Sequence, residues 1–136
     1  MIRPIMTKRF FLRQPSEVAT AQDLDIARDL EETLEAHRAT CVGMAANMIG
    51  VAKRIIVFDN EGNCMTMFNP EIVRCADPYE TEEGCLSLEG VRATTRYNRI
   101  VVQYDDPSFR ACEKTFTGRV AQAVQHEIDH CNGIVI

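Results

Sequence analysis

Apolar residues recur with two different periods along this chain, and the periods predict where helices and strands form. A period close to 3.6 residues predicts a helix over Asp23–Ala39, with Thr20 or Asp23 as its N-cap. The opposite face of this helix is charged, as expected for a face in contact with water. A second helix is predicted over Arg119–Cys131, opened by Gly118. The apolar face of the first helix carries Leu24, Ala27, Leu30 and Leu34.

Short runs rich in β-branched and aromatic residues predict several strands between the two helices. Turn residues at 60–62 and 105–107 separate some of these runs, and Asn69-Pro70 is expected to end another. The order of one early helix, several strands and one late helix favours an α+β fold with a mostly antiparallel sheet. The predicted strands are Ala52–Asp59, Met65–Phe68, Glu71–Ala76, Val91–Tyr104 and a short one over Cys112–Thr117.

Length and charge narrow the class of protein. The 136 residues suit a single domain spanning 1–136. With 20 acidic and 15 basic residues, the net charge of −5 argues against a direct nucleic-acid partner, which normally leaves a basic footprint. No apolar run approaches the ~20 residues of a membrane span. The first twelve residues lack a continuous apolar segment, so we predict a cytoplasmic protein without a secretory signal.

The six cysteines are expected to be reduced thiols, because a chain of this size without a secretory signal does not need a disulfide framework. No pair forms a C-x-x-C motif, which argues against a four-cysteine zinc ribbon. Most of these cysteines are expected to act as small core residues, and at least one is a candidate metal ligand.

The strongest chemical signal is His126-Glu127-Ile128-Asp129-His130. On a helix, histidines spaced i, i+4 point from one face and can hold a divalent metal, with the glutamate as general base for an activated water. The motif therefore indicates metal-assisted hydrolysis, although a helix that merely contains two histidines is the simpler alternative. Asp129 is expected to serve packing or a surface pair, or to support a ligating histidine.

A third ligand must come from upstream, because Ile136 stands where a longer downstream zinc motif would need histidine. His37 lies in the charged first helix and is expected at the surface. Cys131 follows His130 directly and would point away from the ligand face. Cys85 lies in a short, glycine-containing stretch with an irregular predicted backbone, and its thiolate is a candidate to complete the site. Spacing alone leaves the choice open.

Three segments resemble the peptide deformylase family. Gly43–Gly50 is similar to that family's G-φ-A-A-x-Q-φ-G segment, Glu83–Ser87 is identical to its E-G-C-L-S, and Gln125–His130 matches its Q-H-E-x-D-H. The segments follow the family's order and approximate spacing, and the resemblance covers roughly residues 20–135. It implies an α+β fold in which mostly antiparallel strands surround a C-terminal metal-binding helix.

The resemblance also implies a role for each matched residue. Cys85, His126 and His130 would bind one divalent metal, usually Fe²⁺, with Zn²⁺, Ni²⁺ or Co²⁺ as substitutes. Glu127 would take a proton from the attacking water and deliver it to the leaving amine, and the backbone N–H of Leu86 would face the oxyanion. The reaction would be hydrolysis of the N-formyl group of formylmethionyl peptides, which releases formate.

The resemblance further implies a partner and a mode of binding. Backbone groups around Gly43 and Met44 would hold the substrate main chain as an added strand. The partner would be an N-formylated peptide or a nascent chain N-terminus, which places the protein near the ribosome in protein biosynthesis. The process would be N-terminal processing in the cytoplasm.

The chain departs from the family in its first segment, where Met48 replaces the family's glutamine and Cys41 replaces a glycine. In the family, the glutamine donates a hydrogen bond to the formyl oxygen, and a thioether has no donor. Loss of one such donor typically costs ~10²–10³ in rate. Asn47 could supply an amide only if the local chain direction differs, since neighbours in an extended segment point oppositely.

Three functions are therefore compatible with the sequence. The first is a working but slower deformylase. The second is a deformylase-like hydrolase of another small amide or formylated substrate, and the third is a catalytically impaired, metal-bound homologue that binds peptides. The last residues, Gly133–Ile136, are expected to form a final short strand or simply the end of the chain.

Overall fold

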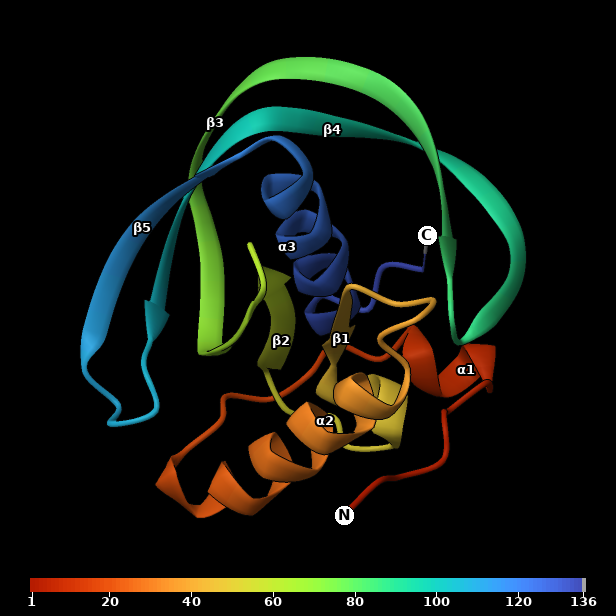
Figure 1. The fold of residues 1–136 in the computed structure, drawn as a ribbon, viewed down its shortest axis with the longest axis vertical. Helices are drawn as coiled ribbons and strands as arrows, with labels where there is room; N and C mark the ends of the chain where they lie inside the picture. The colour runs from red at the N-terminus through yellow and green to blue at the C-terminus, as the bar shows by residue number, and fades with distance from the viewer. Residues whose placement is uncertain (136) are drawn as a thin grey trace.

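A bent antiparallel sheet encloses the C-terminal helix in the computed structural model, which describes residues 1–135 (Figure 1). This arrangement confirms the predicted α+β fold with mostly antiparallel strands around the last helix. The elements are α1 Arg9–Leu12, the 3₁₀ helix η1 Ala21–Asp23, α2 Leu24–Ala36, β1 Gly43–Ala45, the 3₁₀ helix η2 Ala46–Ile49, β2 Ile55–Asn60, β3 Asn63–Cys85, β4 Leu88–Asp105, β5 Ala111–Thr117 and α3 Gly118–Cys131.

Within residues 1–135, the five strands lie in chain order, β1-β2-β3-β4-β5, and each is antiparallel to its neighbours. In Figure 1, the long strands β3 and β4 arch over α3, whereas α2 lies beyond β1 and β2. The short strand β1 pairs only with β2 in this order, so one of its edges faces away from the sheet.

Strand β2 is buried on both faces, which explains its nearly continuous apolar sequence. Ile55 and Val57 belong to a core cluster shared with α2, and Ile56 and Phe58 belong to a second cluster shared with α3. Successive side chains of a strand point to opposite faces, so one strand can supply both cores. All four side chains are 0% exposed, and burial of each contributes about 1.5–3 kcal/mol relative to exposure.

The first predicted helix is present with shifted ends. The N–H of Thr20 donates to Oδ2 of Asp23 at 2.8 Å, and the Thr20 hydroxyl accepts from the N–H of Gln22, so Thr20 caps η1, and Asp23, whose side chain makes no cap bond to α2, completes that capping box. These caps open η1, and α2 continues from it. The helix ends at Ala36, three residues before the predicted end at Ala39.

The prediction that Asn69-Pro70 ends a strand was wrong, because β3 continues through it to Cys85. Asn69 adopts a positive φ of 54°, and the register with β4 shifts between Phe68 and Glu71, so the strand bends instead of ending. The Asn69 side chain stabilises this bend by bonding both the N–H and the carbonyl of Ala19, at 2.7 and 3.0 Å.

The predicted strands Glu71–Ala76 and Val91–Tyr104 are parts of the longer strands β3 and β4. The sequence did not reveal the full length of β3, because residues 77–84 are mostly polar and include Pro78 and Gly84, which are disfavoured in strands. A two-residue turn, Leu86-Ser87, joins the two strands, and a register shift at Gly84/Cys85 gives part of the irregular backbone that we expected there.

The chain after α3 packs against the N-terminal segment. Gly133 has a φ of 75°, and a Cβ on it would lie 2.5 Å from the carbonyl oxygen of Arg13, so only glycine fits here. Residues 133–135 form no strand, and Ile136 of the predicted final strand lies outside the described residues. In residues 1–135, no helix is both long enough and apolar enough to span a membrane.

Candidate metal centre and pocket

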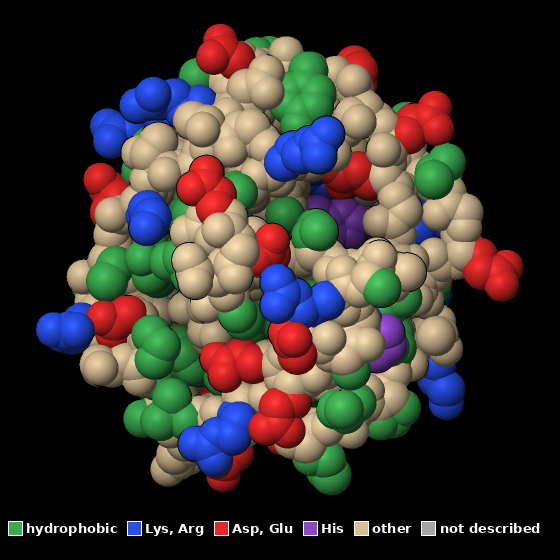
Figure 2. Space-filling model, viewed as in Figure 1, with side chains coloured by type: hydrophobic (Ala, Val, Ile, Leu, Met, Phe, Trp, Pro, Cys, Tyr) green, Lys and Arg blue, Asp and Glu red, His purple; other side chains and the backbone are tan. Residues whose placement is uncertain are grey.

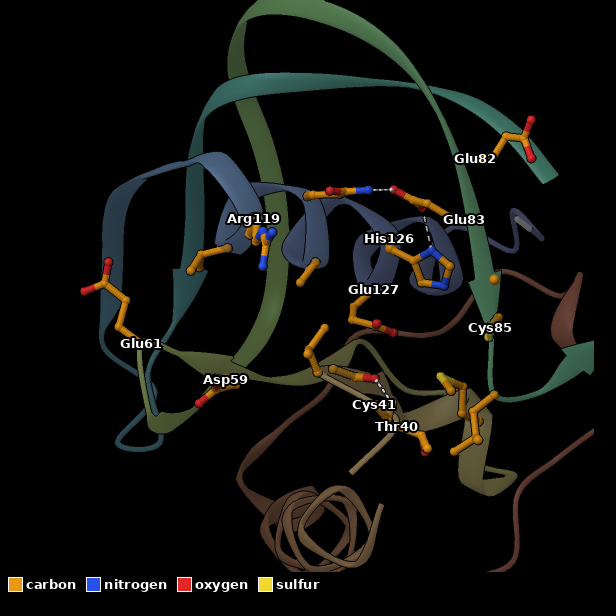
Figure 3. A pocket seen from close by; sticks show the side chains of 18 residues that line it. Thr40, Cys41, Asp59, Glu61, Glu82, Glu83, Cys85, Arg119, His126 and Glu127 are labelled. Carbon is orange, nitrogen blue, oxygen red and sulfur yellow. Dashed lines mark hydrogen bonds and ion pairs between the residues drawn. The ribbon is translucent and has the colours of Figure 1, made fainter. Parts of the chain in front are cut away.

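Three candidate ligands converge where the end of β3 meets the last turns of α3, and Figure 3 shows two of them, Cys85 and His126. Sγ of Cys85 lies 3.3 Å from Nε2 of His130. One ligand atom from each of Cys85, His126 and His130 lies within 4.8 Å of the others, and no other group of three such side chains occurs in the described residues. A thiolate with two imidazoles at this spacing fits a divalent metal such as iron or zinc.

Gln125 fixes helix α3 beneath the sheet by bonding the backbone of β4. The Gln125 side chain accepts from the N–H of Tyr97 at 2.9 Å and donates to the Tyr97 carbonyl at 2.8 Å. On another face of the helix, Val124, Ile128 and Cys131 pack into the α3 core cluster. Cys131 therefore points into the core and not toward the ligands.

A buried chain of charged groups orients the first histidine. Nδ1 of His126 lies 2.8 Å from Oε1 of Glu83, which leaves Nε2 free to face Cys85. Arg96 donates to both oxygens of Glu83, at 2.7 and 3.0 Å, and also pairs with Asp129 at 2.7 Å. Hydrogen bonds thus connect Asp129 to the histidine through Arg96 and Glu83. Such partners fix the orientation of a ligating imidazole.

Burial and hydrogen bonding shift the pKa values of Glu83, His126 and His130. Burial of Glu83 is outweighed by its bonds to His126, Arg96 and Gln122, which lower its pKa to about 2. Burial, together with the neighbouring His126 charge, lowers the pKa of His130 to about 3, so this ring is neutral. For His126, burial is outweighed by hydrogen bonding to Cys85 and Glu83, which raises its pKa to about 10. Metal binding at His126 would therefore release a proton.

Glu127 supplies a buried carboxyl group beside the three ligands (Figure 3). It is 4% exposed, and its Oε1 has no hydrogen-bond partner among the described residues. Burial raises the pKa of Glu127 to about 7. A Cβ on Gly43 would lie 3.0 Å from Oε2 of Glu127, so glycine allows the carboxylate to approach β1. A carboxyl group with this pKa can accept and return a proton near neutral pH.

A pocket of about 620 Å³ opens onto these groups. Cys85, His126 and Glu127 lie at one part of its wall, and Gln122 and Arg119 extend the wall along α3 toward its N-terminus. In Figure 2 a histidine side chain is visible in a hollow that acidic and basic side chains border. The pocket is large enough for a small group at the three ligands and for an attached side chain along α3.

Of the other predicted site residues, all but Met44 line the same pocket. Met48 and Gly43 line it, and Leu86 lines it with 37% of its surface exposed. Met44 is fully buried in the α2 core cluster and does not line the pocket.

Residues 46–49 form the 3₁₀ helix η2 and not an extended segment, and this conformation sets the direction of the Asn47 side chain. The Asn47 amide donates to the carbonyl of His130 at 3.0 Å, which ties η2 to the end of α3. Asn47 therefore does not supply the amide donor that is missing at position 48. His37 is half-buried at the end of α2, where Nδ1 lies 2.8 Å from the carbonyl of Thr33. It is not one of the clustered ligands.

Three residues around His126 were not predicted as part of the site: Glu83, Arg96 and Gln122. The sequence could have indicated that Glu83 lies near the site, because residues i and i+2 of a strand share one face and Glu83 precedes Cys85 by two. Gln122 also carries a signal, since it precedes His126 by one helical turn. Arg96 could not be found in this way, because its contact with Glu83 depends on how β3 and β4 pair.

Comparisons of sequence and of structure both match this chain to peptide deformylases. The polypeptide deformylase family model matches residues 4–136. The peptide deformylase of Clostridium beijerinckii is 50% identical over 136 residues and covers all of both chains. The peptide deformylase of Dictyoglomus thermophilum is 39% identical over 113 residues, covering 82% of this chain and 72% of its own.

Solved structures of peptide deformylases have the same fold. The peptide deformylase of Thermotoga maritima superposes with a TM-score of 0.89 at 28% identity, covering 99% of this chain and 95% of that one. The Met-Ala-Ser-bound class I type b peptide deformylase of Acinetobacter baumannii gives a TM-score of 0.89 at 27% identity, with 99% and 97% covered. The family is metal-dependent, and the Cys/His/His cluster fits such a site. With a family model that spans nearly all of its length, this chain belongs to the peptide deformylase family.

Proposed function

We propose that this protein hydrolyses the N-formyl group of formylmethionyl peptides and nascent chains and releases formate. The observation that carries the proposal is the convergence of Cys85, His126 and His130 next to the buried, unpartnered carboxyl group of Glu127, judged over the described residues. The three side chains would hold one divalent cation, with Fe²⁺ as the proposed metal and Zn²⁺, Ni²⁺ or Co²⁺ as substitutes. When bound, it supplies a Lewis acid that polarises a carbonyl and makes water more acidic.

Glu127 is the proposed general base and then the general acid. Its burial leaves one carboxylate oxygen without a partner in residues 1–135, so that oxygen is free to take a proton from water. The same carboxyl group then gives the proton to the departing amine, as its pKa of about 7 allows. Glu83 keeps the ring of His126 in place during both steps.

The substrate is proposed to lie between β1 and the turn after Cys85. The edge of β1 that faces away from β2 would receive the peptide main chain as an added strand at Gly43. The backbone N–H of Leu86 would donate to the oxyanion. The side chain of the formylated residue would extend along α3 in the pocket. Nascent chains are made in the cytoplasm near ribosomes, which is where we propose that the protein acts.

Formate release tests this function directly. Anaerobically purified, iron-loaded protein is incubated with formyl-Met-Ala-Ser, and acetyl-Met-Ala-Ser serves as the matched control. We expect formate in proportion to enzyme with the first peptide and no hydrolysis of the second, because the pocket must enclose the acyl group beside Glu127. Formate release no higher than in buffer alone would overturn the proposal. Cleavage of the acetylated peptide at an equal rate would instead indicate a general amide hydrolase.

A second experiment concerns Met48, whose sulfur lies 3.5 Å from the N–H of Ala45. In a Met48→Gln variant, the amide oxygen can accept from Ala45 and thereby turn the NH₂ group toward the pocket. We expect kcat/KM for formyl-Met-Ala-Ser to rise by up to ~10²-fold, because an oxyanion donor is added. Met48→Leu, which adds no donor, is the control and should show no gain. An unchanged kcat/KM in a stably folded Met48→Gln variant would refute the missing-donor account.

A further inference from the structure

Every acceptor position of the Glu83 carboxylate is occupied. Oε1 accepts from Nδ1 of His126 at 2.8 Å and from Nη2 of Arg96 at 2.7 Å. Oε2 accepts from Nε of Arg96 at 3.0 Å and from Nε2 of Gln122 at 2.8 Å. An ionised carboxylate has about four lone-pair sites, so these four hydrogen bonds fill it. Figure 3 draws the bond to His126 and the position of Glu83 above the pocket.

Unlike Arg96, Gln122 both donates to Glu83 and forms part of the pocket wall. It lies four residues before His126 on α3, so both side chains are on one face of the helix. Arg96 approaches from β4 and is 4% exposed, whereas Gln122 is half-buried and lines the pocket together with His126. Gln122 therefore joins the pocket wall to Oε2 of Glu83, which lines the same pocket.

We propose that Gln122 is a positioning residue, which acts through Glu83 to hold the ring of His126 in the orientation that metal binding needs. The proposal rests on the metal-dependent function proposed above. Without the Gln122 amide, one lone-pair site of a buried carboxylate is open to water in the pocket. Glu83 can then shift away from Nδ1 of His126, and the ring loses its fixed orientation.

The test is the affinity of the protein for Co²⁺ alone, measured by competition with a chelator. Gln122→Met keeps the length of the side chain and removes the donor. We expect its apparent Kd to rise about 3–10-fold, less than the ~10–100-fold typical for loss of a direct partner of a ligating histidine. The absorption spectrum of the Co²⁺-loaded variant should also change, because the ligand geometry is altered. An unchanged Kd together with an unchanged spectrum would overturn the proposal.

Gln103→Met is the matched control. Gln103 donates to Glu113 at 3.1 Å on the exposed faces of β4 and β5, so the same substitution breaks a Gln–Glu bond away from the pocket. Its Co²⁺ affinity should equal that of the wild type. An equal loss of affinity in the control would mean that the Gln122 effect is not specific to Glu83, which would also overturn the proposal.

A double-mutant cycle with Glu83→Gln shows whether Gln122 acts through Glu83. Coupled residues give non-additive changes. The Gln122→Met substitution should therefore alter Kd by less than about 2-fold in the Glu83→Gln background, whereas additive losses would contradict the proposed route. These measurements need no substrate, so a failed formate assay would leave this inference standing, and a failed affinity test would leave the deformylase proposal standing.

Discussion

Replacing Glu127 with Gln is expected to lower kcat for formyl-Met-Ala-Ser by ~10²–10⁴-fold, the usual contribution of a positioned general acid–base. The amide has nearly the same shape but cannot take up and return a proton. Glu127 is not one of the three clustered ligands, so metal content should stay at the wild-type level. Steady-state formate release and metal analysis on the same preparation measure both quantities.

The stability of this variant provides an internal check on its fold. Burial raises the pKa of folded Glu127 from 4.5 to about 7, so the carboxyl group loses its proton at a lower pH in the unfolded chain than in the folded one. Folding stability is then lost as pH rises from about 4.5 to about 7, and at pH 8 the ionised side chain is unfavourable. In the metal-free protein, Glu127→Gln should therefore raise Tm at pH 8.

The control for Glu127 is Glu113→Gln on the exposed face of β5, which should keep wild-type kcat. If Glu127→Gln retained more than about a tenth of wild-type kcat, its role as the acid–base group would be refuted, since even the low end of such contributions exceeds this. A low kcat accompanied by lost metal would mean that the substitution had damaged the ligand cluster instead.

Replacing Cys85 with Ser is expected to weaken metal binding more strongly than any other single change considered. Loss of a group that only supports a ligand costs ~10–100-fold in affinity, so loss of the ligand itself should cost more than ~100-fold. A hydroxyl is a harder and less acidic donor than a thiol, and it leaves His126 and His130 as the remaining pair. Chelator competition with Zn²⁺ gives the affinity, and formate release should fall with metal occupancy.

Cys41→Ser is the matched control for this experiment. Cys41 lines the same pocket, and its thiol donates to the carbonyl of Gly43 at 2.9 Å, a bond that a serine hydroxyl can also make. Cys41 is not one of the clustered ligands, so Zn²⁺ affinity should be retained. Equal affinities for Cys85→Ser and the wild type would contradict the proposed ligand set.

Local patterns predicted those parts of the fold in which burial is regular. The continuous apolar run of β2 was recognisable because this strand faces a core cluster on both sides. The long arm of β3 was missed from residue 77 onward, because residues 77–84 are mostly polar, include Pro78 and Gly84, and are held by their pairing with β4. The bend at Asn69 was taken for a strand end, because its contacts with Ala19 join segments far apart in the chain.

The residues of the candidate site also fall into two groups: those that the sequence predicted and those that required the structure. Helix geometry alone puts His126 and His130 on one face, so the sequence was sufficient for this pair. Cys85 was identified by a resemblance, since spacing left other ligands open. The side chains that orient His126 required coordinates, because Glu83 and Arg96 meet only through the register between β3 and β4.

By itself, the sequence determined the elements with regular apolar patterns, the paired histidines with their adjacent carboxylate, and the family to which the chain belongs. These features are local, because a period of 3.6 or 2 residues fixes which side chains share a face. Only the tertiary structure decided that Cys85 reaches His130, that Met48 lines the pocket while Asn47 bonds the end of α3, and that Gln122 reaches Glu83. Those contacts depend on strand register and helix packing, which join residues distant in the chain and leave no periodic trace in it.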